Sequence, residues 1–132
     1  MTSYSIMLVD DEPANRDLAS LALAELGLGQ TILVAGNGEE AIGILHRQLS
    51  LAAAPTVMLL DLDLPGRHGR EVLAYSAQHP ELKHIAVVIL TTDEDPAERE
   101  RCLALGAVAY WIKPNSYDEL VVLLSGLRRW LS

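Results

Sequence analysis

The sequence predicts an α/β domain in which helices cover both faces of a five-stranded parallel sheet. Short apolar runs alternate with helical patterns along the chain, as expected of right-handed β-α-β crossovers. The run 56–60 carries no charge, which is typical of a strand buried on both faces. The 132 residues, 50% of them hydrophobic, are enough for one domain with its own core. For five such strands the common doubly wound order is 2-1-3-4-5.

The first half of the chain predicts two strands, each followed by a helix. Residues 5–9 form the first apolar run, and Pro13 suits the first turn of the helix after it. Apolar side chains then recur at helical spacing until glycines end the pattern: Leu18, Leu21, Ala22 and Leu26, then Gly27 and Gly29. A second strand is expected at 30–35, and the Gly-Asn-Gly turn at 36–38 leads into the second helix.

The second half predicts three more strands and three more helices. A short Ala-rich connection at 51–55 precedes the central strand 56–60. The remaining elements alternate: a helix at 71–78, a strand at 86–90, a helix ending at Gly106, a strand at 109–112, and a helix from 116 to about 131. The last helix carries one apolar stripe, formed by Leu120, Leu123, Leu124, Leu127 and Leu131.

The composition excludes several classes of partner. The net charge of -8 argues against binding to nucleic acid or to an anionic membrane, because either needs a surplus of Lys and Arg. No apolar run approaches the length that crosses a bilayer. Residues 1–5 lack the segments of a signal peptide, and Cys102 is the single cysteine, so no disulfide can form within the chain. We expect a cytoplasmic protein without nucleic-acid or membrane partners.

Acidic and polar residues stand where the predicted strands end. Asp10 and Asp11 follow the first strand, Asp61 the central one, and Thr91 and Lys113 the fourth and fifth. In open parallel sheets, reactive groups gather at the carboxyl ends of the strands. The order 2-1-3-4-5 would bring the three carboxylates to one crevice, with Thr91 and Lys113 on the other side of Asp61. An Asp pair alone is more often a solvated turn, so the prediction depends on this joint placement.

Three carboxylates at one rim favour a bound cation. They repel one another unless a cation joins them, and all-oxygen ligands suit Mg²⁺. With the charge neutralised, Asp61 can act as a nucleophile toward phosphorus and form an aspartyl phosphate. The metal and Lys113 would then hold the phosphoryl oxygens, and Thr91 would donate to a third oxygen.

These motifs occur together in one known family. They are Asp10-Asp11-Glu12-Pro13, Asp61-Leu62-Asp63-Leu64-Pro65 with Gly69, Thr91, and Tyr110 with Lys113-Pro114. On them, the chain resembles the receiver domain of two-component response regulators over essentially its whole length. The resemblance implies a flavodoxin-like (βα)5 receiver fold and makes Asp61 the phosphoacceptor. It also implies that Asp10 and Asp11 hold Mg²⁺, Asp11 directly, and that Asp63 adds its backbone carbonyl.

The resemblance implies three further features. Thr91 and Tyr110 match the hydroxyl and aromatic pair that rearranges on phosphorylation. Lys113 matches the lysine that contacts the phosphate. Its bond to Pro114 is expected to be cis, a conformation found almost only before proline.

A narrower resemblance concerns the partner. The segments 64–73, 88–92 and 128–131 are similar to those of the small stand-alone regulators paired with phytochrome-type histidine kinases. We therefore expect residues 1–132 to be a single receiver domain without an output domain, phosphorylated by a histidine kinase or a phosphotransfer protein. Two residues depart from the pattern: His68 stands where Asp is frequent, which bears on kinase docking, and Asn115 where Phe is frequent, which bears on the loop after the last strand.

Two other function classes stay open. The Asp61-x-Asp63 motif with Thr91 and Lys113 is also similar to haloacid-dehalogenase-type phosphatases. In that superfamily, however, the Asp-x-Asp motif opens the chain and the acidic pair comes late. The other class is a degenerate receiver that serves as an unphosphorylated interaction module, which the intact Asp61, Thr91 and Lys113 disfavour.

The last strand and helix predict an interaction surface. Tyr110 and Trp111 are consecutive in an edge strand, so alternation points one to each side of the sheet. Val122 and Trp130 lie off the apolar stripe of the last helix, and spare apolar surface with Trp often marks a contact. We predict a homodimer through the fourth helix, the fifth strand and the fifth helix. The competing interpretation is that Trp130 folds back over its own domain.

Overall fold

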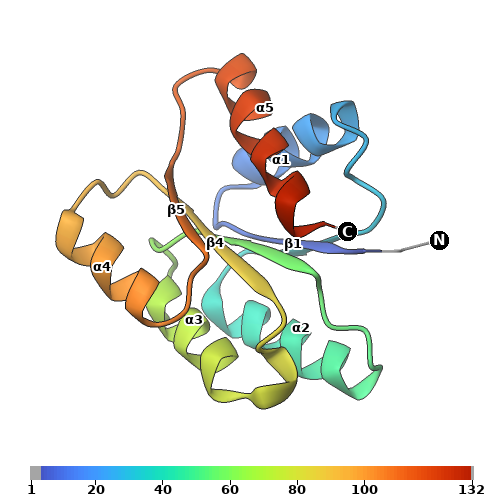
Figure 1. The fold of residues 1–132 in the computed structure, drawn as a ribbon, viewed down its shortest axis with the longest axis vertical. Helices are drawn as coiled ribbons and strands as arrows, with labels where there is room; N and C mark the ends of the chain where they lie inside the picture. The colour runs from blue at the N-terminus through green and yellow to red at the C-terminus, as the bar shows by residue number, and fades with distance from the viewer. Residues whose placement is uncertain (1–3, 132) are drawn as a thin grey trace.

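A computed structural model describes residues 4–131 and contains every strand and helix that the sequence predicts (Figure 1). The strands are β1 (Ile6–Val9), β2 (Ile32–Ala35), β3 (Val57–Leu60), β4 (Ala86–Thr91) and β5 (Ala109–Ile112). The helices are α1 (Pro13–Glu25), α2 (Gly38–Ser50), α3 (Gly69–Gln78), α4 (Pro96–Ala104) and α5 (Tyr117–Ser125). Two short 3-10 helices, η1 (Pro80–Leu82) and η2 (Gly126–Trp130), complete the order. Residues 1–3, which include most of the N-terminal segment considered above, and residue 132 lie outside the described part of the chain.

All five strands are parallel and lie in the order β2-β1-β3-β4-β5. This confirms the doubly wound topology predicted from the sequence. Helices α1 and α5 cover one face of the sheet, and α2, α3 and α4 cover the other (Figure 1). The strand ends that carry the predicted site residues therefore meet along one edge of the sheet.

The three central strands are buried on both faces. Every residue of β1, β3 and β4 is buried, and alternate side chains enter the two core layers. Met7, Val9, Met58 and Leu60 pack with α2 and α3, whereas Ile6, Leu8, Val57 and Leu59 pack with α1 and α5. A strand that is apolar on both faces is thus explained by helices on both sides.

Local signals set where the helices start. Asn37 caps α2 by accepting from the Glu40 N–H at 2.8 Å, and Ser116 caps α5 by accepting from the Glu119 N–H at 3.2 Å. Such side chains satisfy backbone donors that have no partner within the helix. The helix α1 begins with Pro13, as predicted.

The end of the last helix differs from the prediction. The α-helix stops at Ser125, and the chain continues as the 3-10 helix η2 to Trp130. Gly126, a poor helix former, stands at this change. A Cβ at Gly126 would lie 3.3 Å from the Trp111 ring, so the glycine lets the chain approach that ring closely.

The aromatic residues of β5 point to opposite layers, as alternation requires. Tyr110 belongs to the core on the α2–α3–α4 side, and Trp111 to the core on the α1–α5 side. Trp130 packs against Trp111 with ring centroids 6.0 Å apart. The interpretation that Trp130 folds back over its own domain is therefore correct, whereas Val122 on α5 remains 73% exposed.

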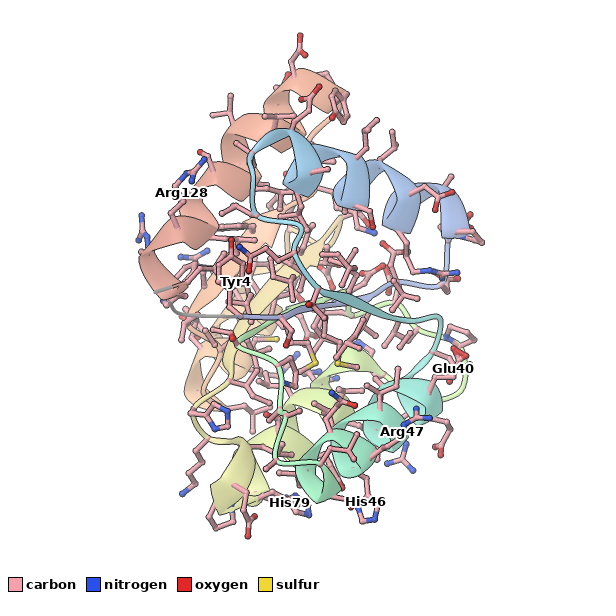
Figure 2. All side chains as sticks on the ribbon, turned by 90° about the vertical axis from the view of Figure 1, so that its right-hand side faces the viewer. Tyr4, Glu40, His46, Arg47, His79 and Arg128 are labelled. Carbon is pink, nitrogen blue, oxygen red and sulfur yellow. The ribbon has the colours of Figure 1, made fainter. Side chains whose placement is uncertain are left out.

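A polar contact joins the two helices of the α1–α5 layer near their ends. Figure 2 labels Arg128, whose Nη2 donates to the Leu26 carbonyl at 2.9 Å and so joins the end of the chain to the end of α1. His46 and His79 lie on the opposite side of the molecule, at the outer edge of the α2–α3 layer. None of the helices among residues 4–131 is long and apolar enough to cross a bilayer.

Candidate functional site

The three predicted carboxylates meet at the carboxyl edge of the sheet. Asp10 and Asp11 follow β1, and Asp61 follows β3, its neighbour in the sheet. Each offers one oxygen atom, and these atoms all lie within 4.8 Å of one another. Asp10 and Asp61 are buried, whereas Asp11 is exposed. The site is therefore a partly closed acidic pocket with one side open to solvent.

Lys113 joins two of these carboxylates. Its Nζ donates to Asp10 Oδ2 at 2.7 Å and to Asp61 Oδ2 at 2.9 Å. The backbone of Lys113 is held at the end of β4, because its N–H donates to the Thr91 carbonyl at 2.8 Å. Lys113 follows β5, on the side of Asp61 away from β1, as the strand order predicts. Its side chain nevertheless extends past Asp61 to Asp10, which follows β1.

The pKa values of Asp61 and Lys113 are both raised, for different reasons. Burial raises the pKa of the Asp61 carboxyl, and the hydrogen bond and charge of Lys113 offset only part of that increase. Burial lowers the pKa of the Lys113 ammonium, but its bonds to Asp10 and Asp61 outweigh this, so the net shift is upward. A cation is thus favoured between carboxylates that would otherwise repel one another.

Asp10 is held in place by the start of α1. Its Oδ1 accepts from the Glu12 N–H at 2.9 Å, and Asn15 Nδ2 lies 3.4 Å from both carboxylate oxygens. Arg16 Nη1 donates to the Asp10 carbonyl at 2.5 Å. Asn15 and Arg16 were not among the site residues predicted from the sequence. Their position in the first turns of the helix after the acidic pair was the available signal.

The start of α3 lies directly against the phosphoacceptor candidate. A Cβ at Gly69 would collide with the Asp61 carbonyl oxygen and lie 2.7 Å from Leu62 Cα, so only glycine permits this close approach. His68, noted above as a departure, caps α3 by accepting from the Arg70 N–H through Nδ1 at 3.0 Å. The exposed Asp63 contributes its backbone N–H, which donates to Asp61 Oδ1 at 3.3 Å.

The predicted switch residues meet at a third residue. Thr91 is fully buried, and its Oγ1 accepts from the Asp93 N–H at 3.3 Å. The Tyr110 hydroxyl donates to the Asp93 carbonyl at 2.6 Å. Burial, with the nearby Asp93 charge, raises the pKa of Tyr110 to about 12. Both side chains thus hold the loop that leads into α4.

The expected cis bond before Pro114 is a wrong prediction. None of the peptide bonds between the described residues is cis, so Lys113 and Pro114 are joined in trans. Even before proline, the trans form is favoured by about 0.5–1 kcal/mol. Asn115, the second departure, is exposed in the loop before α5.

The donor set fits a hard divalent cation. Three carboxylates with their oxygen atoms in mutual reach are the kind of ligands that Mg²⁺ and Mn²⁺ prefer. The open side at Asp11 leaves room for the waters that Mg²⁺ retains. A cation there would also relieve the repulsion among the carboxylates, which Lys113 balances in part.

Comparisons with known proteins agree with this geometry. The family model described as "Response regulator receiver domain" matches residues 6–125. Response regulator Rcp1 of Synechocystis sp. is 32% identical over 129 residues, which cover 96% of this chain and 88% of Rcp1.

Two solved structures are similar over nearly the whole length. The phosphorylated cyanobacterial phytochrome response regulator RcpA has a TM-score of 0.89 and 33% identity, with 99% of this chain and 96% of that chain covered. The Mn²⁺-bound form of Rcp1 has a TM-score of 0.86 and 30% identity, with 98% of this chain and 96% of the Rcp1 chain covered. These matches decide against the phosphatase alternative. The chain belongs to the response regulator receiver family.

Proposed function

We propose that this receiver accepts a phosphoryl group on Asp61 from a histidine kinase or a phosphotransfer protein and slowly hydrolyses it. The observation that carries the proposal is the position of the Lys113 ammonium, 2.7 Å from Asp10 and 2.9 Å from Asp61. A buried carboxylate beside a lysine and two further carboxylates is suited to receive a phosphoryl group and to balance its charge. The single receiver domain of residues 1–132 is the unit that acts.

A divalent cation belongs to the proposed reaction. Asp11 and Asp61 would bind Mg²⁺, with Asp10 beside them and the Asp63 backbone carbonyl as a further ligand. When bound, the metal would neutralise the carboxylates and the incoming phosphoryl oxygens. The Mn²⁺-bound form of the relative Rcp1 and the carboxylate cluster of this chain support this assignment.

The residues of the chain then have separate roles. One Asp61 oxygen attacks phosphorus, the new O–P bond forms, and the bond between phosphorus and the donor imidazole nitrogen breaks. Lys113 turns from the carboxylate to a phosphoryl oxygen. The Thr91 hydroxyl donates to another oxygen, and because Thr91 also holds Asp93, the change reaches the loop before α4 and Tyr110.

The partners follow from the relatives and from the surface. RcpA is a phytochrome response regulator, and we extend this to a phytochrome-type kinase as the donor for this chain. The face formed by α4, β5 and α5 would bind a second copy of the chain. The proposed setting is the cytoplasm, with no nucleic-acid partner, consistent with the net charge of -8.

Incubation with acetyl phosphate and Mg²⁺, followed by intact-mass measurement, tests the proposal. We expect one added phosphoryl group on the wild type and none on Asp61→Asn. Asp63→Asn is the matched control, because it changes a nearby exposed aspartate and leaves Asp61 intact. Labelling of Asp61→Asn at the wild-type rate would remove Asp61 from its role. Complete absence of labelling in the wild type would favour the unphosphorylated interaction module.

A further inference from the structure

Helix α4 has little apolar anchoring on the sheet. Among its residues, only Glu98 and Cys102 are buried. Its largest apolar side chain, Leu103, is 39% exposed. A helix in a protein is usually held by a buried apolar stripe. Something else must therefore fix α4 against the rest of the domain.

An ion pair between the buried Glu98 carboxylate and the partly exposed Arg70 side chain, 39% exposed, provides part of that attachment. Arg70 of α3 brings its Nε within 2.6 Å of Glu98 Oε1, and the Glu98 side chain is only 8% exposed. The Arg70 Nε–H is buried without an aligned hydrogen bond, so the contact is an electrostatic one. Separation of the pair would leave the Glu98 carboxylate uncompensated in a poorly hydrated place, so the pair favours the geometry in which Arg70 stays beside it.

The second arginine near Glu98 cannot serve the same purpose. Arg101 Nη1 lies 3.4 Å from Glu98 Oε2, but both residues belong to α4. Their contact lies within one helix and leaves the position of that helix undetermined. Arg70 is thus the partner that joins α3 to α4.

Helix α4 is also connected to the two predicted switch residues, Thr91 and Tyr110. The loop residue Asp93 is bonded to the Thr91 hydroxyl and to the Tyr110 hydroxyl. From α4 itself, Arg99 Nη1 donates to the Tyr110 carbonyl at 3.1 Å. The helix, its preceding loop and Tyr110 therefore form one hydrogen-bonded unit.

We propose that the Arg70–Glu98 ion pair is a clamp that positions this unit against α3 and restrains its response to phosphorylation of Asp61. The positioning follows from the geometry alone, whereas the restraint rests on the proposed function. A Thr91 hydroxyl that turns toward a phosphoryl oxygen still accepts from the Asp93 N–H, so the loop follows it. Because the loop continues into α4, the clamp opposes that movement. Arg70 and Glu98 are positioning residues and do not touch the phosphoryl group.

Hydrogen exchange of the unphosphorylated full chain tests the positioning. In Arg70→Met, we expect α4 amides to exchange at least about tenfold faster than in the wild type, while β1 and β3 amides change by less than about twofold. Arg101→Met is the matched control, because it removes the other arginine on Glu98, and it should resemble the wild type. Equal acceleration of α4 and the central strands would show a contribution to global stability only and would overturn the clamp. Unchanged α4 exchange would overturn it as well.

A second variant and a second assay keep the two proposals separate. If Arg70→Met does not fold, Glu98→Gln removes the same ion pair with little change in shape, and the same exchange pattern is expected. In the acetyl phosphate assay, the clamp variant should be labelled about threefold faster or more, because less work is needed to move α4. Labelling at the wild-type rate despite faster α4 exchange would overturn the restraint. Absence of labelling in the wild type would refute the proposed function and leave the exchange result standing.

Discussion

Lys113 Nζ lies 2.9 Å from Asp61 Oδ2, although 52 residues separate the two in the chain. The ammonium also contacts Asp10, so Lys113→Met would leave two buried carboxylates without their cation. Loss of one partner of a buried ion pair costs about 3–5 kcal/mol. In metal-free buffer, we expect Lys113→Met to lower the free energy of unfolding by an amount of that order. With Mg²⁺ the decrease should be smaller, because the metal replaces the missing charge. Urea unfolding with EDTA and with Mg²⁺ measures the difference, and equal losses in both buffers would contradict the shared site.

The same substitution should also slow phosphorylation. If Lys113 binds a phosphoryl oxygen in the transition state, its removal should reduce the labelling rate by about 10²–10³, as for the loss of an oxyanion donor. Lys83→Met is the control, since Lys83 is exposed in the loop after η1. Intact-mass time courses with acetyl phosphate give both rates. A Lys113→Met protein labelled as fast as Lys83→Met would refute the role of Lys113.

Removal of Asp11 should separate metal binding from folding. Asp11 is exposed, so Asp11→Ala removes a proposed ligand without opening the core. We expect a free energy of unfolding in EDTA within about 0.5 kcal/mol of the wild type, together with loss of Mn²⁺ binding by calorimetry and loss of labelling. Asp17→Ala changes another exposed aspartate of the α1 region and should leave Mn²⁺ binding and labelling intact. Wild-type labelling in EDTA would contradict the requirement for metal.

The sequence predicts those features of the site that depend on where strands end. An apolar run that stops at a carboxylate is a local pattern, and parallel pairing brings all such ends to one edge. Asp10, Asp11 and Asp61 were therefore accessible from the chain alone. The Arg70–Glu98 pair was not, because it depends on how two neighbouring helices on the same face of the sheet are rotated toward each other. The contact between Trp111 and Trp130 likewise depends on the change from α-helix to 3-10 helix after Ser125. The leucines continue at helical spacing through this point, so the sequence pattern does not indicate the change.

The free energy of unfolding should decrease at alkaline pH because of Tyr110. Its pKa is raised from 10.0 to about 12, so between these values the folded protein keeps a proton that the unfolded chain has lost. Stability from Tyr110 is therefore complete below pH 10 and declines as pH approaches 12. At pH 8 the free energy of unfolding of the wild type should exceed that of Tyr110→Phe by about 1 kcal/mol, the value of one hydrogen bond. The difference should shrink in the alkaline range, and a constant difference would contradict the raised pKa.

The last prediction concerns the face formed by α4, β5 and α5. Because Trp130 packs on Trp111 within the same domain, Trp130→Ala would disturb the fold and is a poor probe of an interface. Val122 is 73% exposed on α5, and an exposed β-branched residue on one of the elements of this face is the better anchor for a second copy. Ile112, at the end of β5, is a second exposed apolar residue on the elements of this face.

Val122→Asp should therefore shift a homodimer toward monomer, because dimerisation would bury an unpaired carboxylate on each copy. Leu51→Asp is the matched control, since Leu51 is a 65% exposed apolar residue in the connection after α2, on the other helical layer. Sedimentation of both variants and the wild type, each with and without acetyl phosphate, gives the association state. Thr91 and Tyr110 are both bonded to Asp93, in the loop before α4; under the proposed function the Thr91 hydroxyl turns toward the phosphoryl group, so phosphorylation should change the wild-type dimer constant. A wild type that stays monomeric at micromolar concentrations in both states would refute the homodimer and assign the face to a different protein.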